Sequence, residues 1–172
     1  KQIAVAERMY EQDYDGRGSG NHLAVQVNGR WWEWWSALQP YTKNWQLFRC
    51  PSSSINIYNG VNYGKRGCGD SPLSGENSNA MWYGDIVGLP APAETIQFAD
   101  WGTGNGHRLC PHWHQGATYV GYPHAYLHND GCNYAFYDGH VKWMKYSSTF
   151  SASSNLWLYN KTGAVPTTGV PG

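Results

Sequence analysis

The residues most suited to metal binding or catalysis in this sequence are its histidines, because six of the seven lie between positions 107 and 140. His107, His112 and His114 flank Cys110. Alternate residues of an extended segment project to the same side, which suits a zinc or copper site. The spacing matches no standard structural zinc motif, and a disulfide would remove Cys110 from the ligand set. A transition-metal site and an ordinary loop are both open interpretations.

Two aspartates support a second metal hypothesis. Asp13 and Asp15 precede Gly16, as at the start of an oxygen-rich calcium loop. The glutamate that ends a complete EF-hand loop is absent. The two interpretations are therefore calcium bound by Asp13 and Asp15, and a solvated helix end.

A third chemistry would be catalysis by acidic and histidine side chains. The sequence has no nucleophile elbow, phosphate loop, dinucleotide fingerprint or His-Glu-x-x-His motif. Asp100, His128 and Asp138 would converge if a strand at 95–101 pairs near a hairpin at 132–146. We expect these residues to form a hydrogen-bond network that holds loops to a sheet, and we predict no enzymatic activity.

The four cysteines show no CxxC spacing, which argues against a zinc ribbon or a redox motif. In an extracellular chain two disulfides are natural. Four cysteines allow three connectivities. We favour Cys50 with Cys68 and Cys110 with Cys132, because each of these pairs closes a loop of moderate length.

Four tryptophans lie within residues 31–35. One hypothesis is carbohydrate binding, with the indole of Trp32 stacking on a sugar ring. The alternative is a short helix over 31–38 that turns Trp32 and Glu33 outward. Its inward residues would be Trp31, Trp34, Trp35 and Leu38.

The elements that must position these side chains begin with a helix over residues 1–14. Apolar residues recur there at spacings of three and four, the pattern of an amphipathic helix. They are Ile3, Ala6, Tyr10 and Tyr14, with Met9 beside them. No capping residue precedes Lys1, so we expect the chain as given to begin inside a longer helix.

The clearest strand signal is Asp138-Gly139 between two alternating runs, 132–137 and 140–146. A two-residue type I′ turn at this dipeptide would pair Tyr137 with His140 and Phe136 with Val141. The predicted apolar face of this hairpin is Cys132, Tyr134, Phe136, Val141 and Trp143. A second hairpin is predicted around Asn28-Gly29, and a strand over 95–101 with Ile96 and Phe98 on one face. Residues 52–79 and 102–123 read as long loops.

Composition excludes some classes of protein. The net charge is zero and only 14% of residues are charged, whereas a nucleic-acid binder normally carries a basic excess. Aromatic residues reach 16%, which fits binding or assembly surfaces and equally fits the packing of a loop-rich fold. No apolar run has the length of a membrane helix, and no signal peptide is present at residue 1.

His128 is followed by nine residues and then Asp138-Gly139, and the strand DGHVKW occupies 138–143. This H-X9-DG element resembles that of bacterial type IV pilin-like (pseudopilin-like) proteins. Residues 1–16 look like the second half of the long helix of that family. Further similar segments, in the same order, are 35–41, 48–52 and 92–96, whose strand ends at Asp100.

The resemblance implies an α+β fold in which an N-terminal helix packs on a small antiparallel sheet with long loops. Residues 1–150 would form the pilin-like domain. The tail at 151–172 goes beyond the pattern of that family; if the protein polymerises, we expect Trp157, Tyr159 and exposed loop aromatics such as Trp32 to form the assembly contacts. The hairpin would then support the helix, with His128 and Asp138 as a clasp between the turn and the preceding loop.

The implied function is a structural, non-catalytic subunit of an extracellular or cell-surface filament. Its partners would be further copies of itself or other pilin-like subunits, with no cofactor required and calcium as an option. Membrane anchoring would need an apolar N-terminal segment that this chain lacks. The alternatives are a polysaccharide-binding module that uses Trp32 and a small metal-binding surface protein.

Overall fold

The computed structural model describes residues 1–20, 22–27, 30–53, 60–66, 89–103, 108–109, 120–123, 128–151 and 156–157. Helix α1 spans Gln2–Asp13 and α2 spans Trp34–Thr42. The strands are β1 (His22–Val27), β2 (Arg30–Glu33), β3 (Tyr63–Arg66), β4 (Ile96–Thr103), β5 (Arg108–Leu109), β6 (Val120–Pro123), β7 (Cys132–Phe136) and β8 (Val141–Met144). Short 3-10 turns lie at Trp45–Phe48, Pro92–Glu94 and Tyr146–Thr149.

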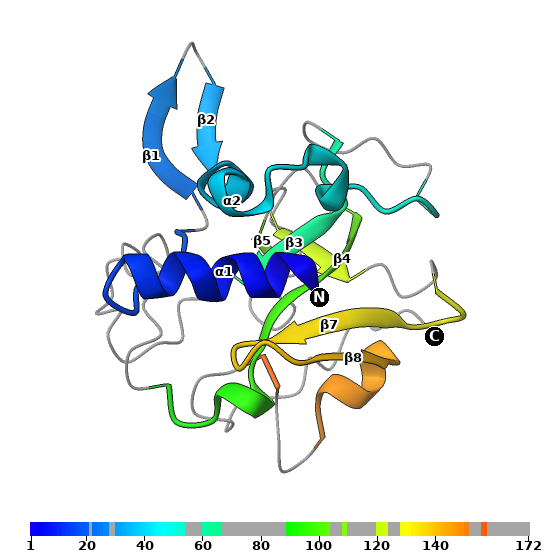
Figure 1. Cartoon of the computed structure of the whole chain (residues 1–172). Helices are drawn as coiled ribbons and strands as arrows, with labels where there is room; N and C mark the ends of the chain where they lie inside the picture. The colour runs from blue at the N-terminus through cyan, green and yellow to red at the C-terminus, as the bar shows by residue number, and fades with distance from the viewer. Residues whose placement is uncertain are drawn as a thin grey trace.

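The centre of the fold is an antiparallel run of strands in the order β3, β4, β7, β8. Strands β5 and β6 extend the sheet, with β5 parallel to both β3 and β6, and β6 antiparallel to β4. Helix α1 lies across this sheet, and the β1–β2 hairpin projects away from it (Figure 1). The predicted α+β architecture, a helix on a small antiparallel sheet, is confirmed.

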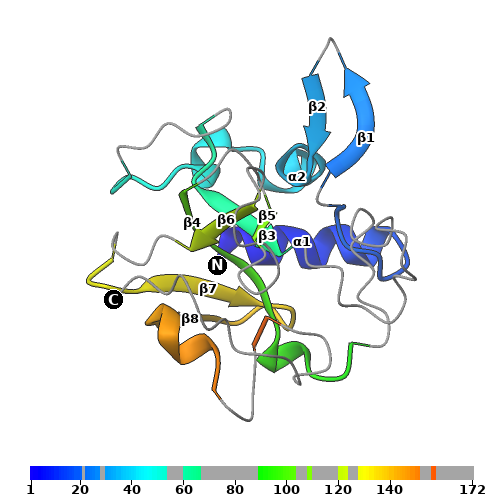
Figure 2. The same cartoon turned by 180° about the vertical axis from the view of Figure 1, so that it is seen from behind.

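Each face of the sheet has its own apolar core. On one face α1 and α2 pack over Phe98 and Ala135; the buried members there are Ala4, Ala6, Trp34, Trp35, Leu38, Phe48, Val61, Phe98 and Ala135. The opposite face is covered by the chain that follows β8, seen from behind in Figure 2. Its buried members are Ile96, Ala99, Leu109, Cys132, Tyr134, Phe136, Met144, Tyr146 and Trp157.

The predicted N-terminal helix is present, but its buried face differs from the predicted one. Ala4, Ala6, Glu7 and Glu11 are buried, whereas Met9 and Tyr14 are about half exposed. Ile3 and Tyr10 pack only at the margin of the core. The face of α1 that meets the sheet is therefore centred on two glutamates.

The predicted β7–β8 hairpin forms, but its register is shifted by one residue. Phe136 pairs with His140 across a three-residue turn, in which the N–H of Gly139 donates to the carbonyl of Phe136 at 2.9 Å. Gly139 has φ +90°, the left-handed conformation that closes such turns. Because a shift of one residue exchanges the two faces of a strand, Met144 is buried and Trp143 is exposed.

The predicted strand at 95–101 is β4, yet Ile96 and Phe98 lie on opposite faces. Ile96 pairs with Phe136 and Phe98 pairs with Ala135, so β4 holds one extra residue at Gln97. Such a β-bulge changes the alternation of side chains. As a result β4 contributes Ile96 to one core and Phe98 to the other.

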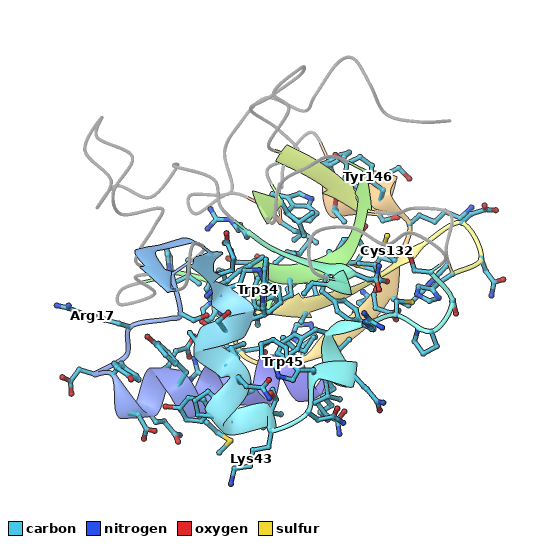
Figure 3. All side chains as sticks on the ribbon, turned by 90° about the horizontal axis from the view of Figure 1, so that it is seen from above. Arg17, Trp34, Lys43, Trp45, Cys132 and Tyr146 are labelled. Atoms are coloured by element: carbon cyan, nitrogen blue, oxygen red, sulfur yellow. The ribbon has the colours of Figure 1, made fainter. Side chains whose placement is uncertain are left out.

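The tryptophan-rich segment is divided between a strand and a helix instead of forming one helix. The β1–β2 hairpin is confirmed, with Val27 paired to Arg30. Trp34 is fully buried between α2 and the sheet, while Lys43 and Arg17 extend outward (Figure 3). Glu33 is fully buried, so the prediction that it faces outward is wrong.

The segment predicted as a loop over 52–79 contains strand β3. Lys65 is 1% exposed and Gly64 packs against Leu109, where an added Cβ would lie 2.5 Å from Leu109 Cγ. A four-residue strand with lysine and arginine in it carries no apolar alternation, which is why the sequence pattern missed it.

Candidate functional site

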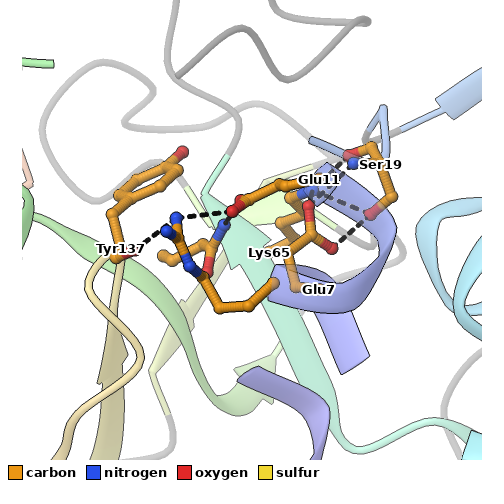
Figure 4. Close-up of polar contacts among 7 residues, drawn as sticks. Glu7, Glu11, Ser19, Lys65 and Tyr137 are labelled. Atoms are coloured by element: carbon orange, nitrogen blue, oxygen red, sulfur yellow. Dashed lines mark hydrogen bonds and ion pairs between the residues drawn. The ribbon is translucent and has the colours of Figure 1, made fainter. Parts of the chain in front are cut away.

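A buried polar cluster fastens α1 to the sheet, and its centre is Lys65 of β3. The Lys65 ammonium donates to Glu7 Oε1 at 2.6 Å and to Ser19 Oγ at 2.9 Å. It also donates to the backbone carbonyl of Ser19. All three residues are at most 1% exposed. Figure 4 shows these contacts together with Glu11 and Tyr137.

Both oxygens of Glu7 are fully engaged. Oε1 accepts the Ser19 backbone N–H at 2.7 Å as well as the Lys65 ammonium, and Oε2 accepts the Ser19 hydroxyl at 2.5 Å. A buried ion pair offsets its desolvation only when such further hydrogen bonds are present. The Gly-rich segment after α1 is thus tied back to the helix by Ser19.

Glu11 lies one helical turn further along the same face. Its Oε2 accepts from Arg8 Nη1 at 2.6 Å, and its Oε1 accepts from the Gln97 amide at 3.3 Å. Burial, followed by the nearby charge of Glu7, raises the pKa of the Glu11 carboxyl to about 7. Arg8 also donates to the backbone carbonyl of Tyr137 at 3.3 Å, so the hairpin turn joins the same set of contacts.

This cluster is suited to holding structure rather than to catalysis. A serine next to a lysine is one arrangement of nucleophile and base. The lysine must then be neutral, whereas Lys65 is paired with the carboxylate of Glu7 and shielded from solvent. No side chain of the cluster reaches water except that of Arg8, which is 47% exposed.

The second polar group brings together Asp100, His128 and Cys50. Asp100 Oδ2 accepts the Asn133 backbone N–H at 2.8 Å and the Asn133 amide at 3.2 Å. The Nε2 atom of His128 lies 3.5 Å from Asp100 Oδ2 and 3.6 Å from Cys50 Sγ. Asp100 is 1% exposed, so these contacts hold the loop before β7 onto β4.

The same ring nitrogen of His128 faces both the thiol and the carboxylate. A nucleophile, base and orienting acid need the two ring nitrogens to face opposite partners. The arrangement therefore lacks the geometry of a catalytic triad.

The predicted clasp between His128 and Asp138 is not formed. Asp138 lies at the far end of β7, where its Oδ1 accepts from His140 Nδ1 at 2.6 Å and from the His140 backbone N–H at 3.1 Å. Burial opposes ionisation, but these bonds from His140 outweigh it and lower the pKa of Asp138. Of the predicted trio, only Asp100 and His128 come together, because strand β7 separates the two ends of the motif.

The predicted disulfides involving Cys50 and Cys132 are absent. Both residues are buried free thiols, and Cys68 and Cys110 lie outside the described residues. Cys132 faces the core that holds Tyr134 and Trp157, and burial raises its thiol pKa to about 12. A thiol that stays protonated is a poor nucleophile.

The metal hypotheses remain predictions. Asp13 Oδ2 accepts the Tyr41 hydroxyl at 2.7 Å. Within the described ranges, no three His, Cys, Asp or Glu side chains are grouped so that they could hold a metal ion. His107, His112 and His114 lie outside those ranges, so the transition-metal hypothesis is untested.

Of the residues predicted to make assembly contacts, only the side chain of Trp157 is described by the structure. Trp157 is fully buried in its own domain, where its indole N–H donates to Thr149 Oγ1 at 2.8 Å and its ring packs edge-on against Tyr134. Its assignment as an assembly contact is therefore wrong, because the ring completes the core. The Trp32 side chain and Tyr159 lie outside what the structure describes.

Exposed apolar side chains identify a different candidate contact surface, which we call the α1 outer face. It consists of Val5 and Met9, which lie one helical turn apart and are 48% and 45% exposed. Tyr14 is 51% exposed but follows the last residue of the helix and stacks on Tyr10, with ring centroids 4.2 Å apart, so it is not part of this face. The face lies opposite Glu7 and Glu11, so the residues that anchor α1 also orient this surface outward.

Sequence reasoning missed Glu7, Glu11 and Lys65. A signal for the glutamates existed, because Glu7 and Glu11 share a helix face with Ile3 and Ala4. Lys65 gave no signal, since its partner is 58 residues away in the chain.

Comparison with known proteins gave no assignment: no family model, no curated protein and no solved structure matches this chain. Among the described residues, neither helix has the length and apolar character needed to cross a membrane.

Proposed function

We propose that this protein is a non-catalytic structural subunit of an extracellular or cell-surface filament. The observation that carries the proposal is the α1 outer face, an apolar surface on a helix whose opposite side is fixed to the sheet. Apolar side chains exposed together on one helix face are typical of sites that pack against another protein.

The rigid attachment of α1 supports this role. A helix that transmits load between subunits must not slide on its own domain, and sliding α1 along the sheet would leave buried charges unpaired, which is costly. Glu7 and Glu11 bind partners on β3 and β4, and Arg8 binds the hairpin turn. Strand β3, strand β4 and the β7–β8 turn therefore all bind the part of α1 between Glu7 and Glu11.

The resemblance to pilin-like proteins gains a physical meaning in this fold. The nine residues between His128 and Asp138 contain the whole of β7. His128 attaches the start of that strand to Asp100, and Gly139 supplies the left-handed residue of the turn at its end. The spacing is thus the length of one strand of the sheet that supports α1.

The filament proposal is tested by electron microscopy and sedimentation of the purified chain. We expect filaments or large oligomers from the wild type, and their loss in the double variant Val5→Gln/Met9→Gln. Glutamine keeps helix propensity while removing apolar surface. Circular dichroism should show unchanged helix content in the variant.

The matched control is Trp45→Gln, which removes an apolar side chain of similar exposure (55%) that is not part of the α1 outer face. It should assemble like the wild type. A wild-type chain that stays monomeric at all concentrations contradicts self-assembly. Equal assembly of the α1 variant and the wild type contradicts the assignment of the surface.

A further inference from the structure

We propose that Glu11 is a proton-operated latch, which holds α1 on the sheet more tightly when its carboxyl is protonated than when it is ionised. This inference is independent of filament formation. It rests on the charges enclosed between α1, β3 and β4.

The enclosed charges do not balance when every group is ionised. Glu7 and Lys65 form a complete pair at 2.6 Å, and both are at most 1% exposed. Glu11 then adds a second negative charge on the same face, itself only 3% exposed. An uncompensated buried carboxylate is costly, and adding a proton is the usual way in which proteins remove that cost.

The groups that face Glu11 come from three elements. On α1 they are Glu7, which repels its negative charge, and Arg8, which attracts it at 2.6 Å. Strand β3 contributes Lys65, whose charge is shared with Glu7. Strand β4 contributes the neutral Gln97. Arg8 offsets Glu11 only in part, because nearly half of its side chain is in water and the attraction is screened.

Gln97 can serve Glu11 in both protonation states. In the structure its amide N–H donates to Glu11 Oε1 at 3.3 Å, which suits an ionised carboxylate. With the amide turned over, its oxygen accepts a hydrogen bond from the acid O–H instead. The latch therefore needs no movement of the backbone to take up its proton.

The direction of the pH effect follows from linkage. The pKa of Glu11 is raised from 4.5 to about 7. A raised folded-state pKa gives stability that is complete below the unfolded-state value and is lost as the pH rises through the folded-state value. The contribution of Glu11 therefore falls between pH of about 4.5 and 7, and is absent above that range.

The test is equilibrium urea unfolding of wild type and Glu11→Gln between pH 5 and 8. We expect the folding constant of the wild type, relative to Glu11→Gln, to fall on the order of 10- to 100-fold across this range. The ratio removes every contribution that the two proteins share. Glu94→Gln, the same change at an exposed glutamate, should show no more than a threefold change in its ratio to wild type.

A second measurement covers the case in which Glu11→Gln does not fold. The side-chain carboxyl carbon of Glu11 in the wild type is followed by NMR as the pH is raised. A midpoint near neutrality supports the latch. A midpoint close to that of an ordinary glutamate, or a pH-independent stability ratio, overturns it.

Discussion

Lys65 is the buried residue that joins strand β3 to helix α1 and to the segment after that helix. Its ammonium reaches the Glu7 carboxylate and two oxygens of Ser19, and it lies 5.6 Å from the centroid of the Phe98 ring. Removing one partner of a buried pair leaves an uncompensated charge, which costs far more than removing both.

We therefore expect Lys65→Met to lower the free energy of unfolding by about 3–5 kcal/mol. The double variant Glu7→Gln/Lys65→Met should recover most of this loss, because neither member of the pair is then left charged without its partner. Urea unfolding at neutral pH measures both. Equal stabilities of the single and double variants would show that the loss comes from packing instead of charge.

Part of the buried polar cluster could be predicted from the sequence. The positions of Glu7 and Glu11 on the apolar face of a helix can be read from their spacing to Ile3 and Ala4. The partners cannot, because Lys65 and Gln97 lie on strands whose pairing depends on the whole sheet. A buried charge is predictable only when both members of the pair are local in sequence.

Among the elements, the β7–β8 hairpin shows how a correct strand prediction can hold a wrong register. Asp-Gly suits a two-residue turn, and it also suits a three-residue turn that ends in a left-handed glycine. The choice decides whether Met144 or Trp143 is buried. Both residues are apolar, so the burial pattern could not discriminate the two registers.

Asp100 on β4 and Asp138 in the hairpin turn are expected to differ sharply in their effect on stability. Asp100→Ala removes the acceptor for Asn133 and the partner of His128, and should lower the free energy of unfolding by about 1–3 kcal/mol. Asp138→Ala changes an exposed turn residue and should cost less than about 1 kcal/mol.

Thermal unfolding of the two variants side by side makes the comparison. A larger loss for Asp138→Ala would restore the clasp that the sequence predicted. Circular dichroism of both variants at low temperature verifies that the native fold is reached.

The whole molecule is a sheet with two covered faces, and both ends of the described chain take part. Helix α1 covers one face, and Tyr146, Phe150, Leu156 and Trp157 pack on the other. The sequence predicted the first layer through the amphipathic helix. The sequence did not predict the second layer. A single Leu-Trp pair in a polar tail can pack on its own domain or on a neighbouring subunit, and the shape of the core determines which of the two occurs.

Trp157 is therefore expected to matter for folding rather than for assembly. Trp157→Ala should lower the free energy of unfolding by about 3–5 kcal/mol, the cost of emptying a core site of this size. Trp45→Ala, the same change at an exposed indole, should cost well under about 1 kcal/mol. Chemical denaturation monitored by far-UV circular dichroism compares the two. A variant at Trp157 that keeps its stability but loses assembly would reverse this assignment.

The anchoring of α1 also has a consequence for the order of biosynthesis. Glu7, Glu11 and Arg8 find their partners 58, 86 and 129 residues further along the chain. Helix α1 is synthesised before any of these partners, yet its last contact waits for Tyr137. During translation its two buried glutamates must stay solvated, with the helix undocked, until most of the sheet has emerged from the ribosome.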